Sequence, residues 1–187
     1  PIVSDLTTRF IVPGKTLAEI SKLLKEEDEE AYLALSQKHI VFRIGGYYVV
    51  SRLLEGEFLD YNAAIPKVSK TTVKINTRSL TDAVERTSLL ISDRLRSPIR
   101  LSAMDQKVQL NCSTSMGKAH DEVDCEMSGE AVSMGFNNKY LMDALKASDC
   151  DMVKLEINGA LSPMRILPLE GESFLFLVLP VRVKNDD

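Results

Sequence analysis

The sequence has no apolar run approaching the roughly 20 residues that a bilayer span needs, which argues against a membrane protein. It opens with Pro1, and no basic segment followed by an apolar one comes next, so no secretory signal is predicted. With 44% hydrophobic and 27% charged residues, the composition favours a packed core over a disordered chain. The length predicts one large domain or two small ones. We expect the chain to be a piece of a longer protein.

Paired cysteines are also missing. Cys112, Cys125 and Cys150 are odd in number, widely spaced and without a C-x-x-C arrangement. Disulfide frameworks use even numbers of cysteines, and zinc sites use close pairs. The sequence therefore predicts three reduced thiols and a cytoplasmic protein.

Catalytic signatures are equally scarce. The two histidines, His39 and His120, form no Ser-His-Asp, Cys-His or H-E-x-x-H pattern, and no glycine-rich phosphate loop occurs. The best candidate metal ligands lie along one predicted strand: His120, Asp121, Glu122, Asp124 and Glu126. Carboxylates along an exposed strand are usually solvated, and their spacing fits no known metal motif. We predict no enzyme, metal or cofactor, with a metal-dependent hydrolase as an alternative.

The pattern of residues 9–56 predicts a short strand, a helix and three further strands. After a strand at Arg9–Val12, Pro13-Gly14 opens a helix near residues 15–25, where Leu17, Ile20 and Leu24 recur at helical spacing. The strands are predicted at Tyr32–Leu35, Ile40–Ile44 and Tyr47–Leu54. Gly45-Gly46 supplies the positive φ angles of a tight hairpin between the last two.

The remaining sequence predicts two further helices among antiparallel strands. Asn76 or Thr77 caps a helix at about 78–92, and Asn137 caps one at Lys139–Ala147. The predicted strands are Val73–Ile75, Ile99–Ala103, Lys107–Thr114, Asp121–Ser128, Val132–Phe136, Met152–Ile157, Met164–Pro168 and Phe174–Arg182. In Asp121–Ser128 the carboxylates of Glu122, Asp124 and Glu126 alternate with the apolar Val123, Cys125 and Met127, which is typical of a half-buried strand.

The first and last segments resemble each other. The helix that contains Lys15 matches the one that contains Lys139, and both continue through an acidic turn into strands. A repeated unit of one helix and several strands cannot bury its sheet face alone. We predict an α+β fold with helices covering one face of antiparallel sheets.

Three stretches carry a specific resemblance. They are Arg52-Leu53-Leu54-Glu55-Gly56-Glu57-Phe58-Leu59-Asp60-Tyr61 with Ile65-Pro66, then Ser128-Gly129 with Gly135-Phe136-Asn137, Tyr140-Leu141 and Ala144-Leu145, and finally Phe176-Leu177-Val178-Leu179-Pro180-Val181-Arg182. In this order they resemble the bacterial sliding clamp, the β subunit of DNA polymerase III. The resemblance implies that residues 1–70 are the C-terminal half of clamp domain two with its connector, and 71–187 are domain three. A Gly-His-Arg-Leu segment expected earlier in such a clamp does not occur.

The family resemblance implies a mechanical function. Such clamps are head-to-tail homodimers when full length, and they enclose duplex DNA without reading its sequence. They bind polymerase and clamp-loader subunits through short linear motifs. A diffuse phosphate interaction suits a sliding ring, because tight contacts would stop movement. An interaction scaffold that has lost DNA encirclement remains an alternative.

The resemblance also implies a pocket that binds a peptide carrying a Gln and apolar anchors. Its wall is predicted from Leu59, Ala64, Asn137, Tyr140, Leu161, Pro163, Leu177, Leu179, Pro180 and Val181. Ordinary core packing is the competing interpretation of these residues. Leu59 replaces a common Pro, and Ala63 stands where a long polar side chain is expected, so peptide preference would differ.

Two further surfaces are predicted. The side chains expected to face DNA are Lys15, Lys22, Lys25, Arg78, Arg86, Lys139 and Lys146, which lie on the predicted helices. Charges on helices are commonly just solvated, and that interpretation stays open. Leu89, Leu90 and Ile91 are predicted at the ring interface, against the alternative of a buried helix end.

Overall fold

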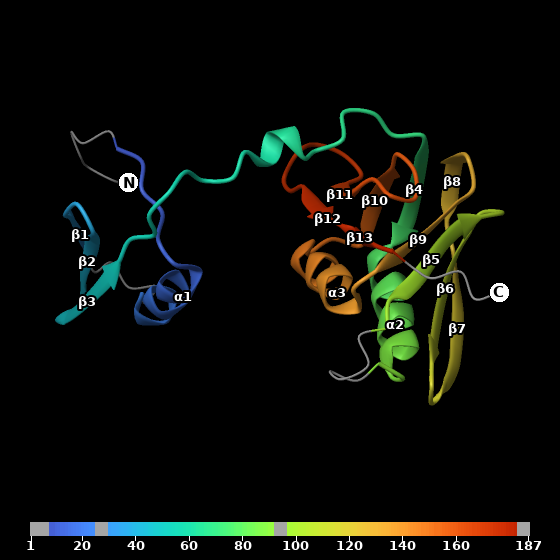
Figure 1. Cartoon of the computed structure of the whole chain (residues 1–187), viewed down its shortest axis with the longest axis horizontal. Helices are drawn as coiled ribbons and strands as arrows, with labels where there is room; N and C mark the ends of the chain where they lie inside the picture. Colours follow the sequence, from blue (N-terminus) through green and yellow to red (C-terminus); the bar gives the residue numbers. More distant parts are fainter. Residues whose placement is uncertain (1–7, 25–29, 92–96, 183–187) are drawn as a thin grey trace. The chain divides into compact units, whose positions relative to one another are not determined.

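The chain folds into two compact units. The computed structural model describes residues 8–24, 30–91 and 97–182, and the division between the units falls between Asp60 and Tyr61. The division drawn from the sequence assigns residues 61–70 to the first unit instead. Each unit combines helices with antiparallel strands (Figure 1), which confirms the α+β prediction.

In the first unit a single described helix packs on a three-stranded sheet. The elements are α1 Gly14–Leu23, β1 Tyr32–Leu35, β2 His39–Ile44 and β3 Tyr47–Arg52, with strand order β1-β2-β3. Ile20 of α1 and Ile40, Phe42 and Ile44 of β2 form its buried cluster. The predicted end of this helix at residue 25 lies outside the described residues.

Two local features shape the first unit. Gly45 and Gly46 have φ angles of 51° and 84°, as the tight turn between β2 and β3 requires. The strand predicted at Arg9–Val12 is reduced to one β-bridge between Ile11 and Leu54. The segment before α1 therefore pairs with the segment after β3.

The second unit contains two five-stranded sheets and two helices. Its elements are η1 Tyr61–Ala63, β4 Thr71–Asn76, α2 Thr77–Ser88, β5 Ile99–Met104, β6 Lys107–Thr114, β7 Gly117–Asp124, β8 Glu126–Gly129, β9 Val132–Phe136, α3 Asn138–Ala147, β10 Met152–Ile157, β11 Met164–Pro168, β12 Phe176–Val178 and β13 Pro180–Val181. The strand orders are β12-β11-β10-β4-β8 and β13-β9-β5-β6-β7. Asn76 and Asn137 cap the helices as predicted, each accepting a backbone N–H at 2.9 Å.

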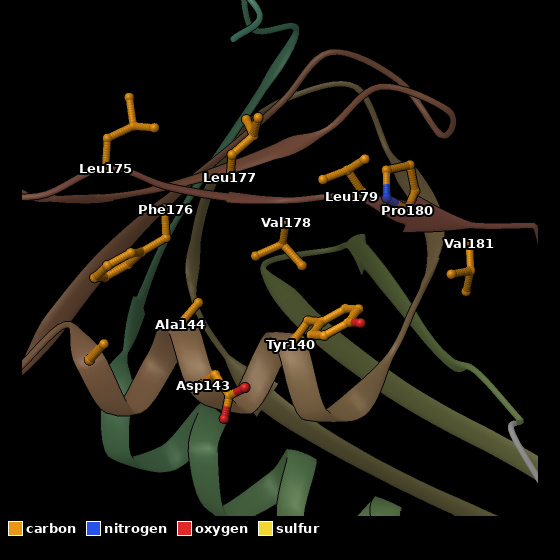
Figure 2. A pocket seen from close by; sticks show the side chains of 11 residues that line it. Tyr140, Asp143, Ala144, Leu175, Phe176, Leu177, Val178, Leu179, Pro180 and Val181 are labelled. Carbon is orange, nitrogen blue, oxygen red and sulfur yellow. The ribbon is translucent and has the colours of Figure 1, made fainter. Parts of the chain in front are cut away.

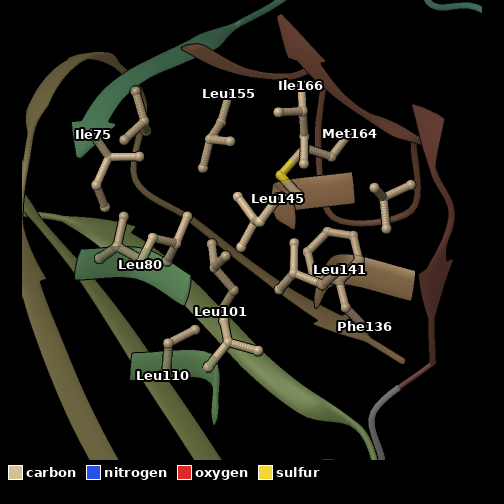
Figure 3. Close-up of a cluster of buried hydrophobic side chains, with 14 of the residues drawn as sticks. Ile75, Leu80, Leu101, Leu110, Phe136, Leu141, Leu145, Leu155, Met164 and Ile166 are labelled. Atoms are coloured by element: carbon tan, nitrogen blue, oxygen red, sulfur yellow. The ribbon is translucent and has the colours of Figure 1, made fainter. Parts of the chain in front are cut away.

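The core of the second unit lies where α2 and α3 meet both sheets (Figure 3). Leu80 of α2, Leu141 of α3, Ile75 of β4 and Leu101 of β5 are fully buried, each with 0% exposure. Burying one such side chain contributes about 1.5–3 kcal/mol. The two helices therefore hold the two sheets together.

The second unit consists of two halves with the same order of elements. One half runs β4-α2-β5-β6-β7 and the other runs β9-α3-β10-β11-β12. The first strand of each half pairs with the second strand of the other, because β4 pairs with β10 and β9 with β5. The first unit has the same order, from the bridge at Ile11 through α1 to β3. The repeat predicted from the sequence is therefore structural.

The prediction of a single strand over Asp121–Ser128 is wrong. The strand is interrupted at Cys125, which separates β7 from β8. β7 joins the sheet of β6, whereas β8 pairs with β4 in the other sheet. Hydrogen bonds from the turn between β5 and β6 stabilise the segment where the chain passes from β7 to β8. The Cys125 N–H donates to the Gln106 carbonyl at 2.9 Å, and the Gln106 side chain bonds both backbone groups of Met127.

The strand predicted over Phe174–Arg182 is divided in the same way. β12 pairs with β11, and β13 pairs with β9 in the second sheet. Leu179 lies between the two strands. The C-terminal segment thus crosses from one sheet to the other above α3 (Figure 2).

Candidate functional site

An apolar pocket lies between α3 and this C-terminal segment. It is a cavity of about 570 Å³. The lining residues are Tyr140, Asp143, Ala144, Ala147, Leu175, Phe176, Leu177, Val178, Leu179, Pro180 and Val181. A helix forms one wall and a crossing strand the other (Figure 2).

The alternation of side chains along the crossing segment shapes the pocket. Phe176 and Val178 point toward α3, whereas Leu177 and Leu179 point to the other side (Figure 2). Val178 is 3% exposed and belongs to the core, whereas Leu179 is 64% exposed. An exposed apolar side chain next to an anchored one can bind a partner without disturbing the core.

Polar groups at the pocket come from α3. Tyr140 is 65% exposed and points toward the crossing strand, and the Asp143 carboxylate lies one turn further along (Figure 2). A hydroxyl and a carboxylate beside aliphatic walls can orient a ligand that the apolar walls bind. The arrangement can therefore bind a peptide with apolar anchors and one polar side chain.

The structure brings five of the ten predicted pocket residues together: Tyr140, Leu177, Leu179, Pro180 and Val181. The predicted residues outside this lining are Leu59, Ala64, Asn137, Leu161 and Pro163. Leu59 belongs to the first unit, and Asn137 instead caps α3. The sequence reasoning missed Leu175, Phe176 and Val178 of the C-terminal segment. It also missed Asp143, Ala144 and Ala147, although their helical spacing from Tyr140 places them on its face.

The predicted DNA-facing cations differ in their surroundings. Lys15, Arg78, Lys139 and Lys146 are exposed on the described helices, and Lys25 lies outside the described residues. Lys22 pairs with Glu19 at 2.8 Å on an exposed helix face.

Arg86 also has an anionic partner. Its Nε donates to the Asp121 carboxylate of β7 at 2.7 Å, and this hydrogen bond holds the Asp121 pKa below its usual range. The same bond raises the pKa of Arg86. Both groups are therefore charged at neutral pH. The negative charge of Asp121 weakens the attraction of Arg86 for a polyanion.

The three predicted ring-interface residues differ in environment. They follow the end of α2 at Ser88 rather than lying within it, because this helix is shorter than the predicted range of about 78–92. Leu89 is 79% exposed, Leu90 is partly buried, and Ile91 packs against the core. Leu89 is thus an apolar side chain that the described structure leaves open to a partner.

The candidate metal ligands are engaged elsewhere. His120 Nδ1 lies 2.8 Å from the Asn111 side-chain oxygen, Glu122 pairs with Lys107, and Glu126 pairs with Lys74 at 3.4 Å. Among the described residues, no three His, Cys, Asp or Glu side chains come close enough to hold a metal ion. None of the described helices is long and apolar enough to cross a membrane.

The three cysteines are free thiols in this fold. Burial raises the pKa of both Cys112 and Cys125, and the nearby Asp124 carboxylate adds to the effect at Cys125. A raised thiol pKa means that these two groups stay protonated at neutral pH. They are therefore poor nucleophiles and pack as small apolar groups.

Comparison with known families covers both units. The central domain of the DNA polymerase III beta subunit matches residues 2–60, and the C-terminal domain of that subunit matches residues 62–182. The chain belongs to the DNA polymerase III beta-subunit family. This membership confirms the family resemblance seen in the sequence and the prediction of a non-enzymatic protein.

Individual beta-subunit relatives agree with this assignment. The beta sliding clamp of Staphylococcus aureus is 34% identical over 174 residues, which are 92% of this chain and 46% of that protein. The sliding clamp structure from Bacillus subtilis has a TM-score of 0.86 at 30% identity, covering 97% of this chain and 49% of that one. The Bartonella birtlesii DnaN clamp, solved bound to griselimycin, has a TM-score of 0.83 at 30% identity, with 93% and 47% covered. The chain thus spans about half the length of these relatives.

Proposed function

We propose that this chain is part of a cytoplasmic sliding clamp that encloses duplex DNA and tethers a polymerase and clamp-loader subunits. The observation that carries the proposal is the match of both units, in order, to the central and C-terminal domains of one clamp family. A complete ring then requires further domains and a second subunit. The exposed Leu89 is the proposed apolar contact at that ring interface.

Partner docking is assigned to the pocket between α3 and the C-terminal segment. Its aliphatic walls suit the apolar anchors of a short peptide, and Tyr140 or Asp143 suits a Gln side chain. The predicted residues of the second unit outside this lining, Ala64, Asn137, Leu161 and Pro163, remain proposed contacts for the flanking parts of the peptide.

Calorimetric titration tests the pocket assignment in the 187-residue chain. The probe is a short synthetic peptide with one Gln and two apolar or aromatic anchors, compared with the same peptide carrying Ala at both anchors. We expect saturable binding of the first peptide only. Equal binding of both peptides, or of neither, contradicts the assignment.

DNA contact is assigned to the exposed cations of the described helices, among them Lys15, Arg78, Lys139 and Lys146. Flexible exposed cations can bind phosphates without reading bases, as a sliding ring requires. The carboxylates Glu122, Asp124 and Glu126 lie on strands or at their ends instead. The described helices carry six cations against the four carboxylates of Glu19, Asp82, Glu85 and Asp143, and this cationic excess favours a polyanion.

Reversal of charge on the helices tests this surface. Changing Lys15, Arg78, Lys139 and Lys146 to Glu is expected to weaken binding to a duplex of about 20 base pairs, because each change replaces attraction to a phosphate by repulsion. The slope of log affinity against log salt should fall by about 0.9 for each phosphate that the variant no longer neutralises. Fluorescence anisotropy of the labelled duplex over a salt series measures both effects.

A matched control carries four reversals away from the helices, at Lys38, Lys67, Lys70 and Lys118, all of which are exposed. It changes the net charge by the same amount as the helix variant. We expect the control to keep most of the salt slope. An equal reduction of the salt slope in the two variants would show that only the net charge of the protein matters. That result would contradict a DNA-binding surface on the helices.

A further inference from the structure

The loop between β10 and β11 contains Asn158-Gly159, the only Asn-Gly pair in the sequence. The loop covers residues 158–163, and the residues on either side of it, Ile157 and Met164, are both 0% exposed. Leu161 within the loop is 75% exposed. The loop therefore lies in solvent between two strand ends that are fixed in the core.

Among the described residues, neither the Asn158 side-chain amide nor the Gly159 N–H takes part in a hydrogen bond. The backbone around these two groups is anchored instead. The Ile157 carbonyl accepts the Lys70 N–H at 2.8 Å, and the Gly159 carbonyl accepts a backbone N–H at 3.2 Å. The Asn158 side chain can therefore rotate toward the Gly159 nitrogen without breaking a hydrogen bond of either group.

Gly159 also leaves room for such an approach. Its φ is 112°, and nothing lies within 4 Å of a Cβ added to it. Glycine has no Cβ that shields its nitrogen from the preceding side chain, and it changes its φ and ψ angles at little cost. Attack by a backbone nitrogen on the preceding amide is therefore least hindered at this position.

The other Asn residues lack this combination. Asn76 and Asn137 cap helices through their side-chain oxygens. The Asn111 side-chain oxygen lies 2.8 Å from Nδ1 of His120. Every Asn in the sequence except Asn158 also precedes a residue that has a Cβ. Asn158 is thus distinguished both by its neighbour and by its unbonded amide.

We propose that Asn158-Gly159 is a site of spontaneous modification, at which Asn158 converts to Asp and isoAsp. The Gly159 nitrogen forms a bond to Cγ of Asn158, the Cγ–Nδ2 bond breaks, and ammonia leaves with the proton of the Gly159 N–H. Water then opens the cyclic imide. Cleavage at Cγ gives Asp, and cleavage at the main-chain carbonyl carbon gives isoAsp. The reaction consumes water and releases ammonia, and it needs no other reactant.

The isoAsp product also defines a class of partner enzyme. Its free α-carboxylate is the group to which isoaspartyl methyltransferases transfer a methyl group from S-adenosylmethionine. The exposure of this loop makes the carboxylate accessible to such an enzyme. The β10–β11 loop is thereby assigned as a substrate of this class.

Conversion changes both the charge and the length of the loop. Both products add a negative charge at position 158, and isoAsp also adds a CH2 group to the backbone. Ile157 and Met164 are fixed in the core, so the loop itself has to take up the added carbon. Leu161 is a proposed peptide contact on this loop, and its displacement should weaken docking. This last effect rests on the proposed function, whereas the reaction does not.

Mass spectrometry of the aged protein tests the proposal. The folded 187-residue chain is incubated at mildly alkaline pH, because the attacking nitrogen must lose its proton, and is then digested with trypsin. Cleavage after Lys154 and Arg165 gives a peptide of residues 155–165, in which Asn158 is the only Asn. We expect this peptide to gain progressively the mass difference between NH2 and OH. Part of the product should accept a methyl group from an isoaspartyl methyltransferase.

Asn111 provides a control within the same digest. Its tryptic peptide covers residues 108–118, and Cys112 follows the Asn. This peptide should keep its amide over the same time. Equal conversion of the two peptides would overturn the proposed site. Conversion of residues 155–165 only after the chain is unfolded in urea would overturn it as well.

Two variants identify the reacting groups. Gly159→Ala keeps the Asn158 amide but adds a Cβ beside the attacking nitrogen, and Asn158→Ser removes the amide. Both should lose the conversion while keeping the fold, as circular dichroism checks, because the loop lies outside the core. An unchanged rate in Gly159→Ala would contradict attack by the Gly159 nitrogen.

Calorimetry separates the modification from the proposed function. The peptide with one Gln and two apolar anchors is titrated into the fresh chain, the aged chain and an aged Asn158→Ser chain. We expect weaker binding only for the aged chain of unchanged sequence. Equal affinity of the fresh and aged chains would overturn the effect on docking. A fresh chain that binds no peptide would count against the pocket assignment alone, because the digest measures the modification without a peptide.

Discussion

Replacing Leu179 and Val181 together by Asp is expected to abolish peptide binding while leaving the fold intact. Their side chains are 64% and 39% exposed, so neither is a main support of the core. Both line the pocket, where an incoming apolar anchor would meet a charged carboxylate instead of a methyl group. Removing two apolar contacts of about 1.5–3 kcal/mol each weakens binding by at least about 100-fold.

The matched control for this variant is Met116→Asp combined with Met104→Asp. These side chains are 73% and 38% exposed and lie at turns of the β5–β6–β7 hairpins, away from the pocket. Circular dichroism and calorimetry of both variants, with the anchor-carrying peptide, separate binding from folding. Unchanged affinity in the Leu179/Val181 variant, or an equal loss in the control, would contradict the pocket assignment.

Local signals in the sequence predicted the elements well. Asn76 and Asn137 cap helices through side-chain oxygens, and Gly45-Gly46 forms its hairpin, because these features depend only on neighbouring residues. The same local reasoning failed at Cys125 and Leu179, where the chain changes sheets. Apolar and polar residues keep alternating through the crossing at Cys125, and Leu179 continues an apolar run, so neither pattern contains a sign of a new partner strand.

The candidate site shows a similar limit. Four residues of the C-terminal segment were identified by resemblance and line the pocket together with Tyr140, whereas Leu175, Phe176 and Val178 of the same segment were missed. The helix wall at Asp143, Ala144 and Ala147 was missed, since a small residue on a helix face usually indicates close packing rather than a pocket. Its recognition required knowing that the strand crosses above α3, which is a long-range feature.

Exposure was the least predictable property. Leu17 and Leu141 occupy the same place in two copies of one motif, yet one is 50% exposed and the other 0%. Hydrophobic periodicity predicts which face of a helix is apolar. It does not predict how completely other elements cover that face.

Gly129→Ala is expected to be strongly destabilising, by more than about 4 kcal/mol, the range of single substitutions with a severe structural cause. Gly129 has a φ of 101° and pairs with Thr71 where β8 joins β4. An added Cβ would overlap the Lys70 carbonyl oxygen and lie 2.9 Å from the Thr71 Cα. These are backbone atoms at the start of a strand inside the sheet, so they cannot move aside without breaking the ladder.

Gly159→Ala is the matched control, because it separates conformational strain from collision. Gly159 has a φ of 112°, but nothing lies within 4 Å of an added Cβ. Its replacement should cost only the strain of a left-handed residue, about 1–2 kcal/mol. Urea unfolding followed by circular dichroism measures both changes. Equal destabilisation of the two variants would show that β8 can shift to accommodate the added Cβ. The stability of the sheet that contains β4, β8 and β12 would then not depend on the close contact of Gly129 with Lys70 and Thr71.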